Sequence, residues 1–223
     1  MAFHRILLPD DRERWKGNEA MGKVSTGLSM SLNGFIAGPN DGAGQPLGEG
    51  GERLFARYSG GDTEYGLPGT EMAFEVSPQS AEFLREVENT MGASVTGRRT
   101  FDISGGWGGR PKGACHLRGH PHGPARMGLR RIAFRVRHGR VESAVRQAKA
   151  VAAEKDVAVM AASIVQQCIG AGLLDDIAVN LVPVLLGEGV RLFEHLGTAP
   201  IELESTGVIE TPGVTHLKFR VVK

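Results

Sequence analysis

The segment VTGRRTFD, residues 95–102, combines residue types that could bind an anion. Arg98 and Arg99 can each hold a phosphate through parallel N–H bonds, and Thr100 can add a hydroxyl donor. Gly97 lets backbone N–H groups approach phosphate oxygens, and a helix starting here would add a favourable dipole. Cations at a helix start otherwise oppose that dipole, so a bound anion would relieve the conflict. The segment therefore predicts a phosphate-binding turn, with a solvated helix start as the alternative.

A second group of chemically active residues lies between residues 110 and 140. Nine Lys and Arg residues occur there, whereas no acidic residue occurs between Asp102 and Glu142. Since the formal net charge is +1, removing these nine charges leaves −8 for the rest of the chain. A nucleic-acid surface is one interpretation, although Phe134 is the only aromatic residue there for base stacking.

A metal site is another interpretation of the same segment. Its candidate ligands would be Cys115, His116, His120 and His122. This spacing is not that of a recognised zinc site, because no second ligand pair lies a dozen residues away. We therefore expect neither a metal nor a nucleic-acid partner, and both remain alternatives.

The composition limits the broad class. The chain has 223 residues, 41% of them hydrophobic and 23% charged, as is usual for a soluble globular domain. No apolar run reaches the roughly 18–20 residues that cross a bilayer, so we expect no membrane partner. Cys115 and Cys168 cannot form a disulfide framework, which favours a reducing cytoplasm.

The hydrophobic pattern predicts strands that alternate with helices. Residues 23–30, 93–97, 157–160 and 176–187 read as strands, and residues 201–210 and 214–222 as a hairpin. Helices are expected from Ser77 or Ser80 to Thr90, over 141–156 and over 163–172, with a short candidate at 51–58. The pattern indicates one α/β domain over 21–223, whose mostly parallel sheet ends in an antiparallel hairpin. Residues 1–20 are expected to lie outside it, with Met21 as an alternative start to Met1.

Five motifs in order carry a family resemblance. They are MSLNGFIAGPND, VTGRRTFDISGGWGG, SIVQQCIGAGLLDD, LVPVLLGEGVRLF and PGVTHLKFRV. Over 21–110 and 141–223 the chain resembles the dihydrofolate-reductase-like family, which shares a domain with the reductase half of the riboflavin-biosynthesis deaminase–reductase. The resemblance implies a three-layer α/β fold and a homodimer. It also implies an NADPH-dependent oxidoreductase acting on a CH–NH or CH–OH group, of the 5-amino-6-(5-phosphoribosylamino)uracil reductase type, with a small heterocyclic or ribosylamino-pyrimidine-like substrate.

By the same resemblance, several positions would bind the cofactor. The phosphates would be held by Gly97, Arg98, Arg99 and Thr100, and the nicotinamide end or a nearby turn would involve Gly187 and Gly189. Relatives usually have two glycines before the SIVQQ helix, where this chain has Ala161 and Ala162. Their methyl groups obstruct a pyrophosphate and make an unusual backbone conformation costly, while Ser163 still offers a hydroxyl and an N–H.

A further departure concerns Asn33, which stands where relatives often have an acid. An amide can orient a substrate but cannot act as a general acid or base. Asn33 is a candidate substrate contact, with a turn role as the alternative. The residues do not identify a proton donor.

The basic segment also departs from the family pattern. Read one base later, suitable codons for residues 119–140 spell VTHTAPQEWAYDGSPFAFVTDG, and those for 113–118 are compatible with VPATFV. Both sequences follow the family pattern, so we interpret 112–140 as an out-of-frame stretch bounded by two compensating indels. We call the version that carries the shifted reading at 113–140 the reframed chain. The printed chain is expected to bind NADPH weakly or not at all, and the leading alternative function is a non-catalytic or inactivated nucleotide-binding relative.

Overall fold

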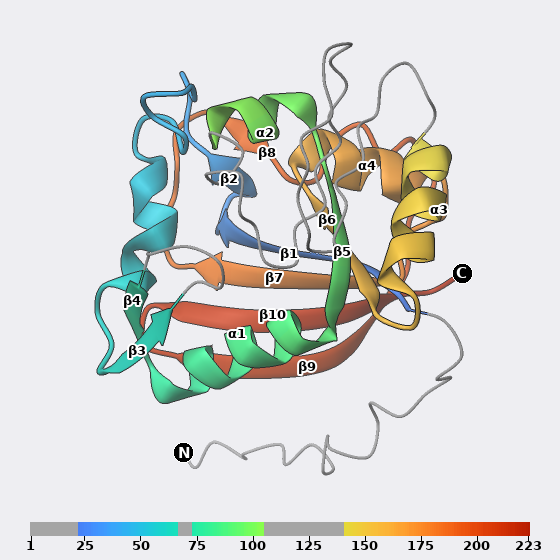
Figure 1. The fold of residues 1–223 in the computed structure, drawn as a ribbon. Coiled ribbons are helices and arrows are strands. Elements are labelled where there is room, and N and C mark those ends of the chain that lie inside the picture. Colours follow the sequence, from blue (N-terminus) through green and yellow to red (C-terminus); the bar gives the residue numbers. More distant parts are fainter. Residues whose placement is uncertain (1–21, 67–72, 105–140) are drawn as a thin grey trace, which may run out of the picture.

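A computed structural model describes residues 22–66, 73–104 and 141–223 (Figure 1). The N-terminal extension 1–20 and the whole basic segment 110–140, with Cys115 and its neighbouring histidines, lie outside these residues. Within them, one sheet has the strand order β5-β6-β1-β7-β10-β9. Its strands are β1 (Val24–Ser31), β5 (Met91–Thr96), β6 (Asp156–Met160), β7 (Asp176–Val182), β9 (Leu203–Thr211) and β10 (Val214–Val221).

The strand directions are those expected from the sequence. The strands β5, β6, β1 and β7 run parallel, and β10 pairs antiparallel with both β7 and β9. Strands β5 and β6 read as short apolar runs because parallel strands in such a sheet are covered on both faces. The mixed, mostly parallel sheet with an antiparallel C-terminal hairpin is therefore confirmed.

Helices cover the two faces of the sheet. They are α1 (Pro78–Thr90), α2 (Arg98–Ile103), α3 (Val141–Ala152) and α4 (Ala162–Gly170), together with the 3-10 helix η1 (Gly51–Tyr58). In the largest core cluster, apolar residues of α3 and α4 pack against one face of the sheet. The sheet contributes Val95, Val159 and Val179 to this cluster. On the other face, the Phe83 ring of α1 stacks on His216 of β10, with ring centroids 4.5 Å apart. The fold thus has three layers (Figure 1).

Local signals explain where α1 begins. The Ser77 hydroxyl accepts a hydrogen bond from the Ser80 N–H at 3.1 Å, and Pro78 occupies the first helical position. A serine cap satisfies one free helical N–H, and proline lacks the N–H that would remain free there. Of Ser77 and Ser80, the two caps that the sequence offered, Ser77 is therefore the one that caps α1.

The structure corrects some expected boundaries. Strand β7 ends at Val182 rather than continuing to residue 187, because Pro183 has no N–H for a ladder bond. The short pairs β2 (Phe35–Ala37) with β8 (Val190–Arg191), and β3 (Thr63–Gly66) with β4 (Ala73–Val76), were not expected. None of the helices in the described parts of the chain is long and apolar enough to cross a membrane.

Candidate functional site

Two strand-to-helix turns meet at the carboxyl ends of β5 and β6. Because these strands are parallel neighbours, with Thr96 opposite Met160, the turn at Gly97 lies beside the turn at Ala161. A Cβ atom on Gly97 would lie 3.7 Å from the Ala161 Cβ and 3.9 Å from the Ser163 Oγ. The fold thus brings together two candidate segments that are more than sixty residues apart in the sequence. Carboxyl ends of parallel strands are the usual place for ligands in α/β sheets.

Both arginines of the first turn are paired with carboxylates. Arg98 forms an ion pair with Asp102, one turn further along α2. The Arg99 guanidinium donates to both Asp41 carboxylate oxygens, at 2.7 and 3.1 Å, and to the Asp41 carbonyl at 2.6 Å. These hydrogen bonds raise the pKa of Arg99. The two arginines and their two aspartate partners therefore have a net charge of zero. The Arg99 side chain is nevertheless 68% exposed.

The second turn contains an unusual backbone conformation. Ala161 caps α4 with φ 91° and ψ 133°, in the left-handed half of the φ range, which favours glycine. Its carbonyl accepts the N–H groups of Ile164 and Val165, at 3.1 and 3.0 Å, so the first turn of α4 holds it in place. Ala162 is buried at 5% exposure, and Ser163 is exposed. The positive φ of Ala161 therefore explains the conformational cost that was expected from an alanine at this position.

Thr96, the last residue of β5, was missed from the sequence. Its side chain is 3% exposed, and its hydroxyl has no hydrogen-bond partner within the described structure. A buried hydroxyl without a partner costs free energy, and a ligand oxygen could supply the missing bond. Its only signal in the sequence was its place directly before Gly97.

Asn33 lies in the turn after β1, where its side chain holds another loop. Its Oδ1 accepts the Leu186 N–H at 3.1 Å and the Ser31 hydroxyl at 2.8 Å. Its Nδ2 donates to the Leu186 carbonyl, and its own carbonyl accepts from Arg191 at 3.0 Å. These bonds correspond to the turn role weighed above, and the substrate contact stays a prediction.

The remaining three predicted positions differ in their surroundings. Gly189 has φ 136°, and a Cβ there would lie 2.0 Å from the Ala37 carbonyl oxygen, so only glycine fits. Gly187 is exposed, with open space around its Cα. Thr100 is half-buried in α2, and its carbonyl accepts the Ser104 N–H at 3.1 Å. Gly189 therefore has a structural role in packing against β2.

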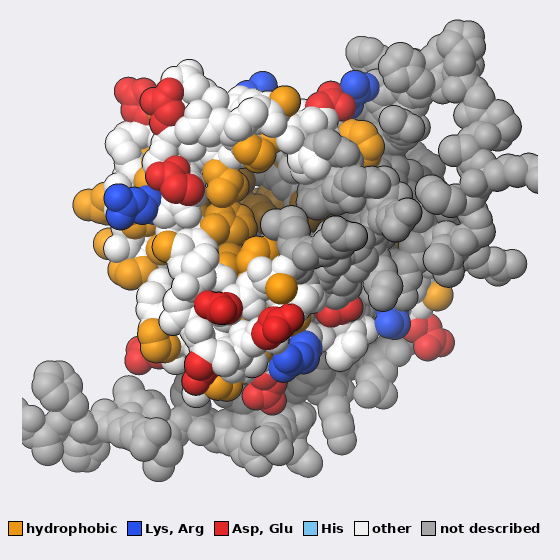
Figure 2. Space-filling view, turned by 60° about the vertical axis from the view of Figure 1, so that its left-hand side comes forward, with side chains coloured by type: hydrophobic (Ala, Val, Ile, Leu, Met, Phe, Trp, Pro, Cys, Tyr) orange, Lys and Arg blue, Asp and Glu red, His pale blue; other side chains and the backbone are white. Residues whose placement is uncertain are grey.

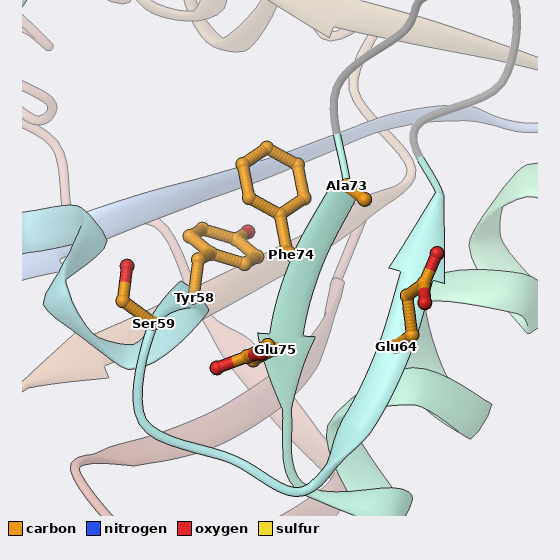
Figure 3. Close-up of a pocket in the computed structure, with 6 residues that line it drawn as sticks. All are labelled: Tyr58, Ser59, Glu64, Ala73, Phe74 and Glu75. Carbon is orange, nitrogen blue, oxygen red and sulfur yellow. The ribbon is translucent and has the colours of Figure 1, made fainter.

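A hollow elsewhere on the molecule lies between η1 and the β3–β4 hairpin (Figure 3). Its lining includes the rings of Tyr58 and Phe74, whose centroids are 4.8 Å apart, and the carboxylates of Glu64 and Glu75. None of the site residues predicted from the sequence lines it. Figure 2 shows apolar side chains around a depression on this side of the molecule. No group of His, Cys, Asp and Glu among the described residues could hold a metal ion.

Comparison with known proteins places the fold. No family profile matches the chain, and no curated protein matches it in sequence. A riboflavin biosynthesis protein from Shewanella sp. PV-4 superposes with a TM-score of 0.60 at 18% identity, covering 91% of this chain and 100% of that one. A pyrimidine reductase-like protein from Corynebacterium diphtheriae gives 0.52 at 13% identity, covering 92% and 93%.

A two-domain enzyme gives a similar result. The deaminase/5-amino-6-(5-phosphoribosylamino)uracil reductase of Thermotoga maritima has a TM-score of 0.58 at 11% identity, and the match covers 91% of this chain. This chain spans only 57% of that protein. The chain therefore has the dihydrofolate-reductase-like fold of riboflavin-biosynthesis reductases, as its motifs indicated.

Proposed function

We propose that the chain is an NADPH-dependent reductase that delivers a hydride to a small heterocyclic, ribosylamino-pyrimidine-like substrate, as in riboflavin biosynthesis. The fold that it shares with such reductases supports the oxidoreductase class. One observation carries the proposal: the turns at Gly97 and Ala161 meet at the carboxyl ends of two parallel strands, and the residue directly before Gly97, Thr96, has a buried hydroxyl without a partner among the described residues. Such a place suits phosphate groups.

The residues present fit the phosphates of a dinucleotide. Thr96 and Ser163 would offer hydroxyl donors, and Gly97 would allow close backbone approach. Arg98 and Arg99 would hold the phosphates by charge-assisted bonds after exchanging carboxylate partners. Among the described residues, the Ala161 methyl narrows the space that a phosphate would have beside Gly97. Bound NADPH would supply the hydride, and these side chains would bind and orient the cofactor.

The same proposal includes a homodimer in the cytoplasm. Burial raises the pKa of the Cys168 thiol to about 12, which keeps it as an unreactive core residue and suits a reducing compartment. Sedimentation equilibrium tests the oligomeric state: a single species of twice the chain mass is expected, and a monomer at micromolar concentration contradicts it.

A second candidate function is a nucleotide-binding protein without reductase activity. The strained Ala161 and the two arginines already paired with acids favour it, because each weakens a dinucleotide site. The two functions separate in one experiment. A reductase binds NADPH and oxidises it when a ribosylamino-pyrimidine is added, whereas the second candidate binds the nucleotide without turnover.

Substituting Thr96 tests the site itself. Thr96→Val removes the hydroxyl at nearly constant volume, so we expect weaker NADPH binding together with unchanged or higher thermal stability, because no existing bond is lost. Thr26→Val is the matched control, since Thr26 is also a buried strand residue but donates to the Val159 carbonyl at 2.9 Å. The control should lose about 1 kcal/mol of stability and keep its NADPH affinity.

Both variants are made in the printed and the reframed chain, with NADPH titrated by nicotinamide fluorescence. An NADPH affinity of Thr96→Val equal to that of the parent would remove Thr96 from the proposed site. No saturable binding by either parent chain would contradict the proposed function as a whole.

A further inference from the structure

The turn at Gly97 is held by a carboxylate from another part of the chain. Asp41 lies 58 residues before Arg99, yet its side chain is only 17% exposed and is engaged by the guanidinium through both oxygens. The loop that carries Asp41 is itself ordered by backbone bonds. The Gly38 N–H donates to the Leu47 carbonyl and the Glu49 N–H to the Pro39 carbonyl, both at 2.8 Å. Asp41 is therefore a positioned partner of Arg99.

The neighbouring arginine is neutralised in a different way. Arg98 pairs with Asp102 at the i,i+4 spacing of a helix, and both side chains are about half exposed. The turn that carries two adjacent arginines thus has two carboxylates beside them and no net charge. A site that attracts a dianionic group would be expected to keep its cations uncompensated.

The two common nicotinamide dinucleotides differ at one group only, which is a 2′-phosphate in NADPH and a 2′-hydroxyl in NADH. A carboxylate repels a phosphate but accepts a hydrogen bond from a hydroxyl, which is how acidic residues recognise the ribose of NAD in other folds. A phosphate that takes Arg98 or Arg99 must also displace an existing carboxylate partner. Both effects act against NADPH, whereas NADH keeps a hydrogen-bond acceptor for its 2′-hydroxyl.

We propose that Asp41 and Asp102 are specificity-determining residues, which reduce the preference of this chain for NADPH over NADH. This inference rests on the proposed function, since it requires a nicotinamide dinucleotide whose ribose 2′ group lies at Arg98 and Arg99, with the pyrophosphate towards Ala161. Asp41 contributes the larger share because it makes the better hydrogen bonds and is the more buried carboxylate. Replacing either acid by its amide removes the charge that repels the 2′-phosphate, and the amide oxygen still accepts a hydrogen bond from the 2′-hydroxyl, so NADPH binding strengthens and NADH binding is kept.

The test measures Kd for both dinucleotides by fluorescence in Asp41→Asn and Asp102→Asn, in the printed and the reframed chain. NADPH is expected to bind about 5–10-fold more tightly in Asp41→Asn and about 2–5-fold more tightly in Asp102→Asn, as for partly exposed ion pairs. The Kd for NADH should stay within about twofold, because the amide oxygen still accepts the hydrogen bond of the exposed 2′-hydroxyl.

Glu86→Gln is the matched control. It removes the same charge from another exposed pair, with Lys218 at 3.1 Å, on helix α1. Neither Kd should change in this control. Arg99→Gln serves as a second variant, for the case that Asp41→Asn does not fold: it leaves Asp41 uncompensated and should weaken NADPH binding more than NADH binding.

The outcomes are distinct. Tighter NADPH binding with unchanged NADH binding supports the inference. An unchanged or weaker NADPH affinity in both amide variants overturns it, as does an equal gain for both dinucleotides, and the proposed function then stands. Failure of every variant to bind either dinucleotide contradicts the proposed function and this inference with it.

Discussion

Replacing Ala161 by glycine should stabilise the protein, although glycine loses more conformational freedom on folding than alanine does. Ala161 has φ 91° and ψ 133°, where its Cβ is strained and glycine is not. The residue cannot relax, because its carbonyl is bonded to two N–H groups of α4 and its methyl packs against the core. The strain is therefore stored in the folded state and is absent from the unfolded chain.

The magnitude follows from three contributions. A residue in such a sparsely populated backbone region costs about 1–3 kcal/mol, which glycine would recover. The greater freedom of glycine in the unfolded chain offsets about 0.5–1 kcal/mol of this gain. The loss of one half-buried methyl offsets less than about 0.8 kcal/mol. We therefore expect a net stabilisation of about 1 kcal/mol, which raises Tm by roughly 2–4 °C in a chain of this size.

Ala162→Gly is the control, because it makes the same chemical change at the next residue. Ala162 begins α4 and is buried, and it has no positive φ to relieve. It should lose about 1–2 kcal/mol from backbone freedom and its buried methyl. Thermal unfolding followed by circular dichroism measures both. If Ala161→Gly lowers Tm as much as Ala162→Gly, the reasoning from backbone strain is wrong.

Two other groups give predictions that need no cofactor. Burial raises the pKa of Asp156, whose carboxylate accepts the Lys23 N–H at 2.8 Å, so its ionised form is disfavoured in the fold. Asp156→Asn keeps an acceptor without the charge. This variant should be more stable than the parent at neutral pH, and the gain should vanish as pH falls below about 3, where Asp156 is protonated. Urea unfolding at both pH values measures the difference in stability. A gain in stability that persists in acid contradicts the prediction. Burial also raises the pKa of Cys168 to about 12, so iodoacetamide should leave it unmodified until urea unfolds the chain, and peptide mass spectrometry showing equal labelling before and after unfolding would refute this.

The elements that were predictable have strong local signals. Ser77 and Pro78 mark the start of α1, because a serine cap and a first-turn proline are favourable wherever the helix packs. The closing hairpin was expected to turn between residues 210 and 214, and Gly213 in this turn adopts a positive φ of 78°. Such features depend on neighbours in sequence, so one sequence suffices to find them.

The small strand pairs could not be predicted in the same way. Strand β8 has two residues and β2 has three, too few for any periodicity to be visible. Their pairing depends on Gly189, whose backbone approaches β2 more closely than a side chain would allow. The end of β7 at Val182 could have been read from Pro183, because proline interrupts a ladder.

The candidate site was predictable in part. Gly97 and the start of α4 were named from the sequence, as was the cost of an alanine in place of glycine at 161. The partner of Arg99 was not, since Asp41 reaches it only through the tertiary fold. The burial of the Thr96 hydroxyl likewise depends on packing around β5, which the sequence pattern does not describe.

The most direct test is an NADPH titration, followed by nicotinamide fluorescence, of the printed chain and the reframed chain side by side. If the protein is a dinucleotide-binding reductase, the reframed chain should bind NADPH saturably. The printed chain, whose residues 110–140 carry nine positive charges, should bind it weakly or not at all. Equal affinities for NADPH would contradict the frame interpretation alone. The absence of saturable binding in both chains would contradict the central claim.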